Sequence, residues 1–186
     1  MVAQEIERET TSLVYESNYQ HLEDELQKLD LMIQFRITKL RLEIQNTAKE
    51  ADRGLSISDE EVDCLLNADE PSVVNSLDLI DIRHRLEMLE NRINQRVTAS
   101  IQHDIFLALP HLSNLFDLSS LESQAVAICL APELHRKYDK LYAYLQDDIT
   151  RMKPSVDLIL ELLCESQSDR WQAGAMFSEH SPLFEA

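Results

Sequence analysis

Nine apolar side chains recur at alternating steps of three and four residues between positions 15 and 44, which is the spacing of one face of an α-helix. They are Tyr15, Tyr19, Leu22, Leu26, Leu29, Ile33, Ile37, Leu40 and Ile44. A stripe sustained over four heptads is typical of a long helix with a coiled-coil-like seam. Only two glycines occur in 186 residues, so few positions favour a break in such a helix.

A second stripe predicts another long helix, formed by Ile82, Leu86, Leu89, Ile93, Val97 and Ile101. Between the stripes, Gly54 marks the end of the first helix, and the capping-box pattern Ser58 to Glu61 opens a short helix over about 59–66. Two long helices joined by a compact connection predict an antiparallel hairpin. We expect Leu26, Leu29 and Ile33 to face residues 86–97. We also expect Arg85, Arg92 and Arg96, which share a helix face, to pair with acids of the first helix.

Shorter helices are expected after Pro110. A capping box at Ser119 to Glu122 opens a helix that should stop before Pro132. Apolar side chains at helical spacing predict a helix over 133–148, and Pro154 is placed to begin a last helix, 154–164. Residues 167–186 are weakly patterned and read as a linker.

These elements predict a mainly α fold. We expect a long helical hairpin with a short capping helix over 1–103, and a compact helical bundle over 104–166. A small β wing stays open as an addition, because strands of two residues leave no readable pattern.

Charge and composition narrow the classes of partner. A net charge of −17 repels phosphate backbones and anionic lipid, so nucleic acid and membranes are unfavourable partners. No apolar run approaches the ~20 residues of a membrane span, and the N-terminus lacks a signal-peptide pattern. Three cysteines at unrelated spacings indicate reduced, buried thiols and a cytoplasmic protein.

Several short blocks resemble a known family. The block Leu130-Ala131-Pro132-Glu133-Leu134, then Tyr138 and residues 141–148, is similar to the winged-helix-like N-terminal domain of bacterial AAA+ ATPases associated with phage-tail-like contractile injection systems. Arg151, Pro154, Ser155 and residues 18–26 and 53–62 extend the resemblance over most of the chain.

The resemblance implies a winged-helix-like bundle, a linker over 167–186 toward an ATPase module, and recruitment of partner proteins to a ring oligomer. ATP and Mg²⁺ belong to the parent protein in this view, and no cofactor is expected in this chain.

The residues themselves offer no catalytic motif. A phosphate-binding loop requires G-x-x-x-x-G-K-[ST], whereas Gly54 and Gly174 are followed by Leu55 and Ala175 with no lysine nearby. Cys129 and His135 lack a second pair at metal-ligand spacing. We therefore expect no enzyme activity, nucleotide site or metal site in this chain.

Six acids with no intervening Lys or Arg are candidate partner-binding residues: Asp59, Glu60, Glu61, Asp63, Asp69 and Glu70. They form either an acidic docking patch for a basic partner or a solvated connection. Tyr144 falls off the apolar face that holds Tyr138 and Tyr142, and is a further candidate contact residue.

Two other functions stay open. The helices near 120–130 and 133–148 resemble a helix-turn-helix with a basic cluster, Arg136, Lys137 and Lys140, which suits a DNA-binding regulator. The net charge opposes this, because DNA readers present a basic face. The long seam alternatively suits a freestanding helical scaffold that dimerises.

Overall fold

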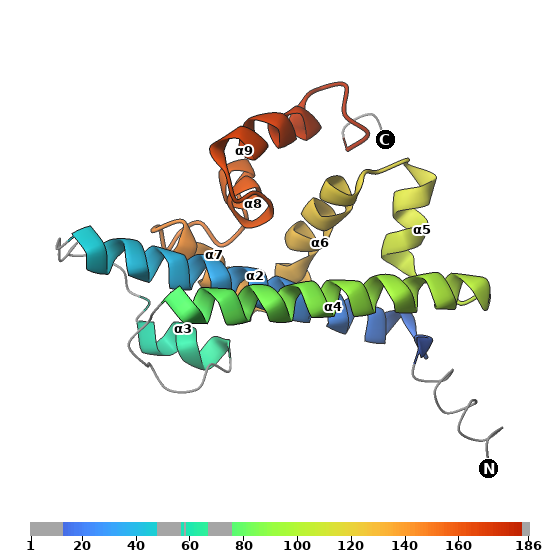
Figure 1. Ribbon diagram of the computed structural model, residues 1–186. Coiled ribbons are helices and arrows are strands. Elements are labelled where there is room, and N and C mark those ends of the chain that lie inside the picture. Colours follow the sequence, from blue (N-terminus) through green and yellow to red (C-terminus); the bar gives the residue numbers. More distant parts are fainter. Residues whose placement is uncertain (1–12, 48–56, 58, 67–75, 184–186) are drawn as a thin grey trace, which may run out of the picture.

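The computed structural model describes residues 13–47, 57, 59–66 and 76–183. Two long helices, α2 (Asn18–Thr47) and α4 (Ser76–Gln102), lie side by side (Figure 1). The other elements surround this pair: α3 (Asp59–Leu65), α5 (Ala108–Leu115), α6 (Ser120–Leu134), α7 (Lys137–Leu145), α8 (Val156–Leu163), α9 (Gln167–Ala173) and the 3-10 helix η1 (Gly174–Phe177). Within these ranges there is no strand, which confirms the predicted mainly α fold. Gly54 and Ser58 lie outside the described residues.

The hairpin of α2 and α4 is antiparallel, as predicted. Asp24, early in α2, binds Arg96 near the end of α4, whereas Phe35, further along α2, lies under Arg83 near the start of α4. An apolar cluster joins the two helices, formed by Leu31, Ile82, Leu89 and Ile93 with Phe35, Leu86 and Val97 packed against it.

The predicted stripe of α2 faces elsewhere. Leu29, Ile33 and Ile37 belong to a second apolar cluster, and its other members come mainly from α6, α7 and α8: Ala125, Ile128, Ala131, Tyr138, Leu141, Tyr142, Tyr144, Leu158 and Ile159. The expected contact of Leu26, Leu29 and Ile33 with α4 is therefore wrong. The reason is that α2 is apolar on two faces. One face packs against α4, and the other, which carries the predicted stripe, completes the core of the bundle formed by the later helices.

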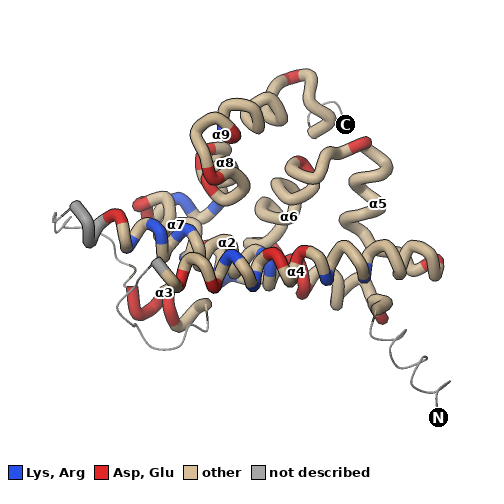
Figure 2. The backbone as a smooth tube through the Cα atoms, viewed as in Figure 1, with Lys and Arg blue, Asp and Glu red and all other residues tan. Residues whose placement is uncertain are grey.

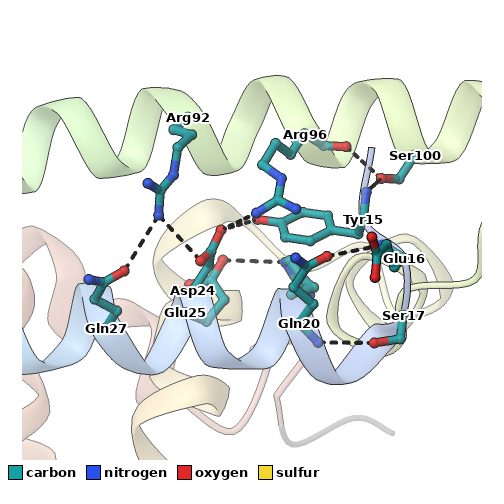
Figure 3. Close-up of polar contacts among 11 residues, drawn as sticks. Tyr15, Glu16, Ser17, Gln20, Asp24, Glu25, Gln27, Arg92, Arg96 and Ser100 are labelled. Carbon is teal, nitrogen blue, oxygen red and sulfur yellow. Dashed lines mark hydrogen bonds and ion pairs between the residues drawn. The ribbon is translucent and has the colours of Figure 1, made fainter. Parts of the chain in front are cut away.

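A polar network fixes the end of the hairpin (Figure 3). The Asp24 carboxylate accepts hydrogen bonds from Arg96 at 2.8 Å, Arg92 at 3.3 Å and the Tyr15 hydroxyl at 3.0 Å. The Arg96 guanidinium lies 3.9 Å from the Tyr15 ring centroid. The Tyr15 backbone N–H donates to Ser100 Oγ at 2.9 Å. Because these contacts of Tyr15 lie on the two long helices, the network joins the chain before α2 to the far end of α4. The predicted pairing with acids of α2 is confirmed for Arg92 and Arg96. It is wrong for Arg85, which lies near Asp81 of its own helix.

Helix α6 begins as predicted but continues past Pro132. Ser119 and Glu122 form the reciprocal capping box. Pro132 lies inside the helix, so the expected end before it is wrong. A proline has no N–H for the carbonyl four residues earlier, which is that of Ile128. The Tyr142 hydroxyl supplies the missing donor, at 2.8 Å from the Ile128 oxygen in a buried position. A side chain of α7 thereby permits the proline in α6.

Replacing Tyr142 with phenylalanine should leave the Ile128 carbonyl buried without a donor, at a cost of about 1–3 kcal/mol in the free energy of unfolding. In a Pro132→Ala background the new backbone N–H can donate to the same carbonyl, so the cost of Tyr142→Phe should be smaller there. Urea unfolding of both single variants and the double variant measures the coupling. Additive effects would show that the hydroxyl does not compensate for the proline.

The C-terminal elements differ in detail from the prediction. Helix α7 starts at Lys137 rather than 133, and Leu134 is exposed. Helix α8 begins at Val156 rather than Pro154, and the Ser155 side chain caps it by accepting from Leu158 N–H. The expected linker from residue 167 contains α9 and η1, and Met176 of η1 lies in the core. Weak patterning there reflects short helices that bury few side chains each.

Candidate functional site

The acidic stretch is partly neutralised by its own fold. Arg41 of α2 lies 2.8 Å from Asp63 and 3.6 Å from Asp59, and Lys140 of α7 lies 2.5 Å from Glu61. The interpretation of this stretch as a run of acids without local counter-charges is therefore wrong, because tertiary contacts bring cations from two other helices. Glu60 is exposed. Asp69 and Glu70 lie outside the described residues, and partner binding by this stretch stays a prediction.

Tyr144 is buried, with an exposed fraction of 1%. Its hydroxyl donates to the Asp59 carboxylate at 2.5 Å, and burial followed by this hydrogen bond raises the pKa of Tyr144. The expectation that it is available as a surface contact residue is wrong. Helix α3 packs on α7, and Val62 of α3 belongs to the same apolar cluster as Tyr144. Tyr138 and Tyr142 are buried as predicted.

Two of the three cations of the basic cluster are engaged in ion pairs, whereas Arg136 is exposed. Lys137 binds Asp30 of α2 at 2.6 Å, and Lys140 binds Glu61 as described above. Five of the nine residues of α7 are buried: Tyr138, Leu141, Tyr142, Ala143 and Tyr144. A recognition helix must lay an exposed face into the major groove, so α7 is poorly placed for that role.

In the described part of the chain, the possible metal ligands form no cluster and the cysteines form no disulfide. No group of three His, Cys, Asp or Glu side chains there is arranged to hold a metal ion. The three cysteines are free, with Cys64 and Cys129 exposed and Cys164 half-buried. The expected burial of all three thiols is therefore wrong.

Two adjoining hollows lie between the hairpin and the shorter helices. The larger, about 430 Å³ in volume, is walled by α2, α4, α6, α8 and α9. Five cations line it: Lys28, Arg36, Lys39, Arg83 and Arg170. Three carboxylates also line it, Glu90, Glu161 and Glu165, and its apolar wall is Met32, Phe35, Leu86, Leu121, Leu162 and Leu163. We call this hollow the basic groove.

The smaller hollow, about 230 Å³, meets the basic groove at Lys28, Glu90 and Gln124, which line both. His21, Glu25 and Lys28 lie along its α2 wall. Glu25 is 2.7 Å from Lys28 Nζ and 3.6 Å from His21 Nε2. His21 is buried, and no hydrogen-bond partner for its Nδ1 occurs among the described residues. A charged cluster at such depth carries a desolvation cost that its internal contacts must offset.

Acid should weaken the fold through this cluster. Burial alone raises the pKa of Glu25, but the hydrogen bond from His21 and the attraction of Lys28 outweigh it and hold the pKa below its ordinary value. A carboxylate with a lowered pKa in the folded state stabilises that state above its unfolded pKa of about 4.3, and the contribution is lost as pH falls further. Glu25→Gln should be less stable at pH 7, with a shallower loss of stability below pH ~4.

Urea unfolding between pH 3 and pH 7 measures this effect. Glu179→Gln, an exposed position on the loop after η1, is the matched control for loss of one carboxylate. Identical pH profiles for the two variants would contradict the role of Glu25.

Sequence reasoning missed the basic groove. Lys28 lies off the apolar stripe of the first helix, yet it is buried and reaches Glu25. The available signal was a set of cations on the first helix, Lys28, Arg36 and Lys39, that break its acidic pattern. Their convergence with Arg83 and Arg170 depends on tertiary packing, which spacing alone does not give.

A family model described as "Winged helix domain, variant" matches residues 4–186. Because the match spans nearly the whole chain, the protein belongs to this winged helix family. No curated protein and no solved structure matches the chain. In the described ranges the domain is represented by helices alone, with no wing strand.

Of the helices that the structure describes, none combines the length and apolar character needed to cross a bilayer.

Proposed function

We propose that this chain is the non-catalytic N-terminal domain of an AAA+ ATPase, and that it recruits partner or substrate proteins to an ATP-driven ring. Assembly or remodelling of contractile injection particles is the process that the resemblance of residues 130–134 and 141–148 suggests. Membership of the winged helix family supports the type of domain. ATP and Mg²⁺ are assigned to the ATPase module of the parent protein.

The observation that carries an interaction role is the basic groove. It is a concave surface with an apolar wall and charged rim, formed by five helices. Binding sites combine such apolar walls with a few placed polar groups. Recruitment through this surface requires no bond chemistry in this chain.

DNA binding is the rival function, since winged helix domains are built around a helix pair of the kind formed by α6 and α7. Against it, Lys137 and Lys140 are paired with acids of the protein, and five of the nine residues of α7 are buried. Fluorescence anisotropy with a labelled DNA duplex should show no binding at 50 mM salt. Binding that weakens steeply with added salt would instead support the regulator.

A dimerising scaffold is the other rival. The predicted seam of the first helix is occupied within one chain, since Leu29, Ile33 and Ile37 of α2 lie in the core of the bundle. The stripe of α4, including Ile82, Leu89 and Ile93, is buried against α2. We therefore expect sedimentation of the isolated chain to give a monomer.

The proposal that this domain belongs to an ATPase is tested by sequencing the natural reading frame that encodes it. We expect it to encode, beyond this domain, a G-x-x-x-x-G-K-[ST] loop whose product hydrolyses ATP. Deleting this domain should leave ATP hydrolysis in place and abolish recruitment of the partner. A natural frame without the loop would overturn the proposal. The chain alone should give no heat with ATP and Mg²⁺ in isothermal titration.

A further inference from the structure

The charge of the basic groove reverses that of the chain. The protein has 34 Asp and Glu against 17 Lys and Arg, two acids for each base. The groove is lined by five bases and three acids. In Figure 2 the basic positions lie mainly on α2, α4 and α7, whereas α3, α5, α6 and α8 carry none. A local excess of cations in a strongly acidic protein selects for an acidic ligand by charge complementarity.

Two cations on the rim of the groove, Arg83 and Lys39, can pair with a carboxylate of a ligand. Arg83 pairs with Glu165 at 2.6 Å, but both side chains are at least half exposed. Exposed ion pairs contribute little, with a median of about 0–1 kcal/mol, so an incoming carboxylate can replace Glu165 at low cost. Lys39 has no ion pair with any residue that the structure describes. These two cations stand on neighbouring helices, α2 and α4.

The ligand must carry negative charge, and the apolar wall of the groove adds a second requirement, that it also carry apolar side chains. Phe35 and Leu86 come from the hairpin, while Leu121, Leu162 and Leu163 come from α6 and α8. Leu121 is more than one-third exposed. A volume of about 430 Å³ admits a few apolar side chains rather than a whole domain. An amphipathic helix meets both requirements, since it presents an apolar stripe to a groove and charges at its borders.

We propose that the basic groove binds an amphipathic helix of a partner protein whose apolar stripe is flanked by acidic residues. Apolar side chains of the helix enter between α4 and α8, and its carboxylates pair with Arg83 and Lys39. This inference rests on the proposed interaction function and names the site and the chemistry of the partner.

The test uses the full chain and two synthetic helical peptides of equal length, with the same leucine stripe and either Glu or Lys at the flanking positions. General electrostatics favours the Lys peptide, because the protein carries a net charge of −17. The groove favours the Glu peptide. We expect the Glu peptide to bind about tenfold more tightly in fluorescence anisotropy, equivalent to about 1.4 kcal/mol, and less tightly at higher salt. Equal binding, or tighter binding of the Lys peptide, would overturn the proposal.

Matched variants locate the binding site. Arg83→Glu combined with Lys39→Glu should weaken Glu-peptide binding at least tenfold. Arg85→Glu should change it less than about twofold, because Arg85 has similar exposure on the same helix but does not line the groove. Leu121→Ser should also weaken binding, whereas Leu115→Ser, exposed on α5 outside the groove, should not. Circular dichroism melting verifies that each variant is folded. Equal losses in groove and control variants would place the peptide elsewhere.

The possible failures are distinguishable. If the Glu peptide does not bind at millimolar concentration while deletion of the domain still abolishes recruitment by the parent ATPase, the groove proposal is wrong and the proposed function stands. If the natural frame lacks an ATPase module but the peptide data hold, the groove proposal survives and the parent assignment fails. A small apolar molecule could also be added as a competitor in the anisotropy assay. If it displaced the Glu and Lys peptides equally well, the groove would be a small-molecule pocket instead of a helix site.

Discussion

Replacing Ile33 with alanine should lower the free energy of unfolding by roughly 2–5 kcal/mol, the range for truncating a fully buried isoleucine in a core. The exposed fraction of Ile33 is 0%, and it packs among side chains of the bundle, including Tyr138 and Leu158. The substitution removes apolar contacts and leaves a cavity that rigid helices cannot close. Urea unfolding followed by circular dichroism measures the loss.

Tyr19→Ala is the matched control, because Tyr19 belongs to the same sequence stripe but is 63% exposed. It should change the free energy of unfolding by no more than about 0.5 kcal/mol. Similar losses for the two variants would mean that the stripe is buried uniformly and that α2 does not pack as described.

Removing the Asp24 carboxylate should cost roughly 3–5 kcal/mol, as expected when one partner of a largely buried ion pair is deleted. Asp24→Ala leaves the Arg96 guanidinium, only 11% exposed, without its counter-ion and deprives the Tyr15 hydroxyl of its acceptor. The loss should appear as a lowered unfolding midpoint in urea.

Arg92→Met provides the comparison, because Arg92 binds the same carboxylate but is 54% exposed. An exposed pair contributes about 0–1 kcal/mol, so this variant should retain most of the stability. If Arg92→Met were as damaging as Asp24→Ala, the stabilisation would come from the exposed side of the network.

Sequence periodicity was sufficient to predict the two long helices and their antiparallel arrangement. Periodicity did not predict which side chains of the two helices contact each other, because Leu31 and Phe35, which form the interface with α4, lie off the main stripe of α2. Periodicity identifies an apolar face but does not say which neighbour covers it. The proline rule failed at Pro132 for a related reason. Its local cost is offset by Tyr142, a contact that exists only after α7 has packed on α6.

The candidate site was less predictable than the fold. Asp59, Glu61 and Asp63 were correctly recognised as an acidic run, but their counter-charges come from Arg41 and Lys140, distant in sequence. Tyr144 was placed off the apolar face by helical geometry, and only the packing of α3 on α7 explains its burial. The cations of the basic groove likewise come from three separate stretches of chain, so its charge reversal is absent from any local window.

Because α2 has two apolar faces, one in each apolar cluster, its packing determines how this protein responds to force and heat. Opening either apolar cluster exposes side chains of the same helix, so the hairpin cannot melt while the bundle remains intact. We therefore expect a single cooperative unfolding transition, with amides in the middle of α2 among the last to exchange in heavy water. We also expect a pull on whatever occupies the groove to load both apolar clusters together, because α2 contributes to each of them.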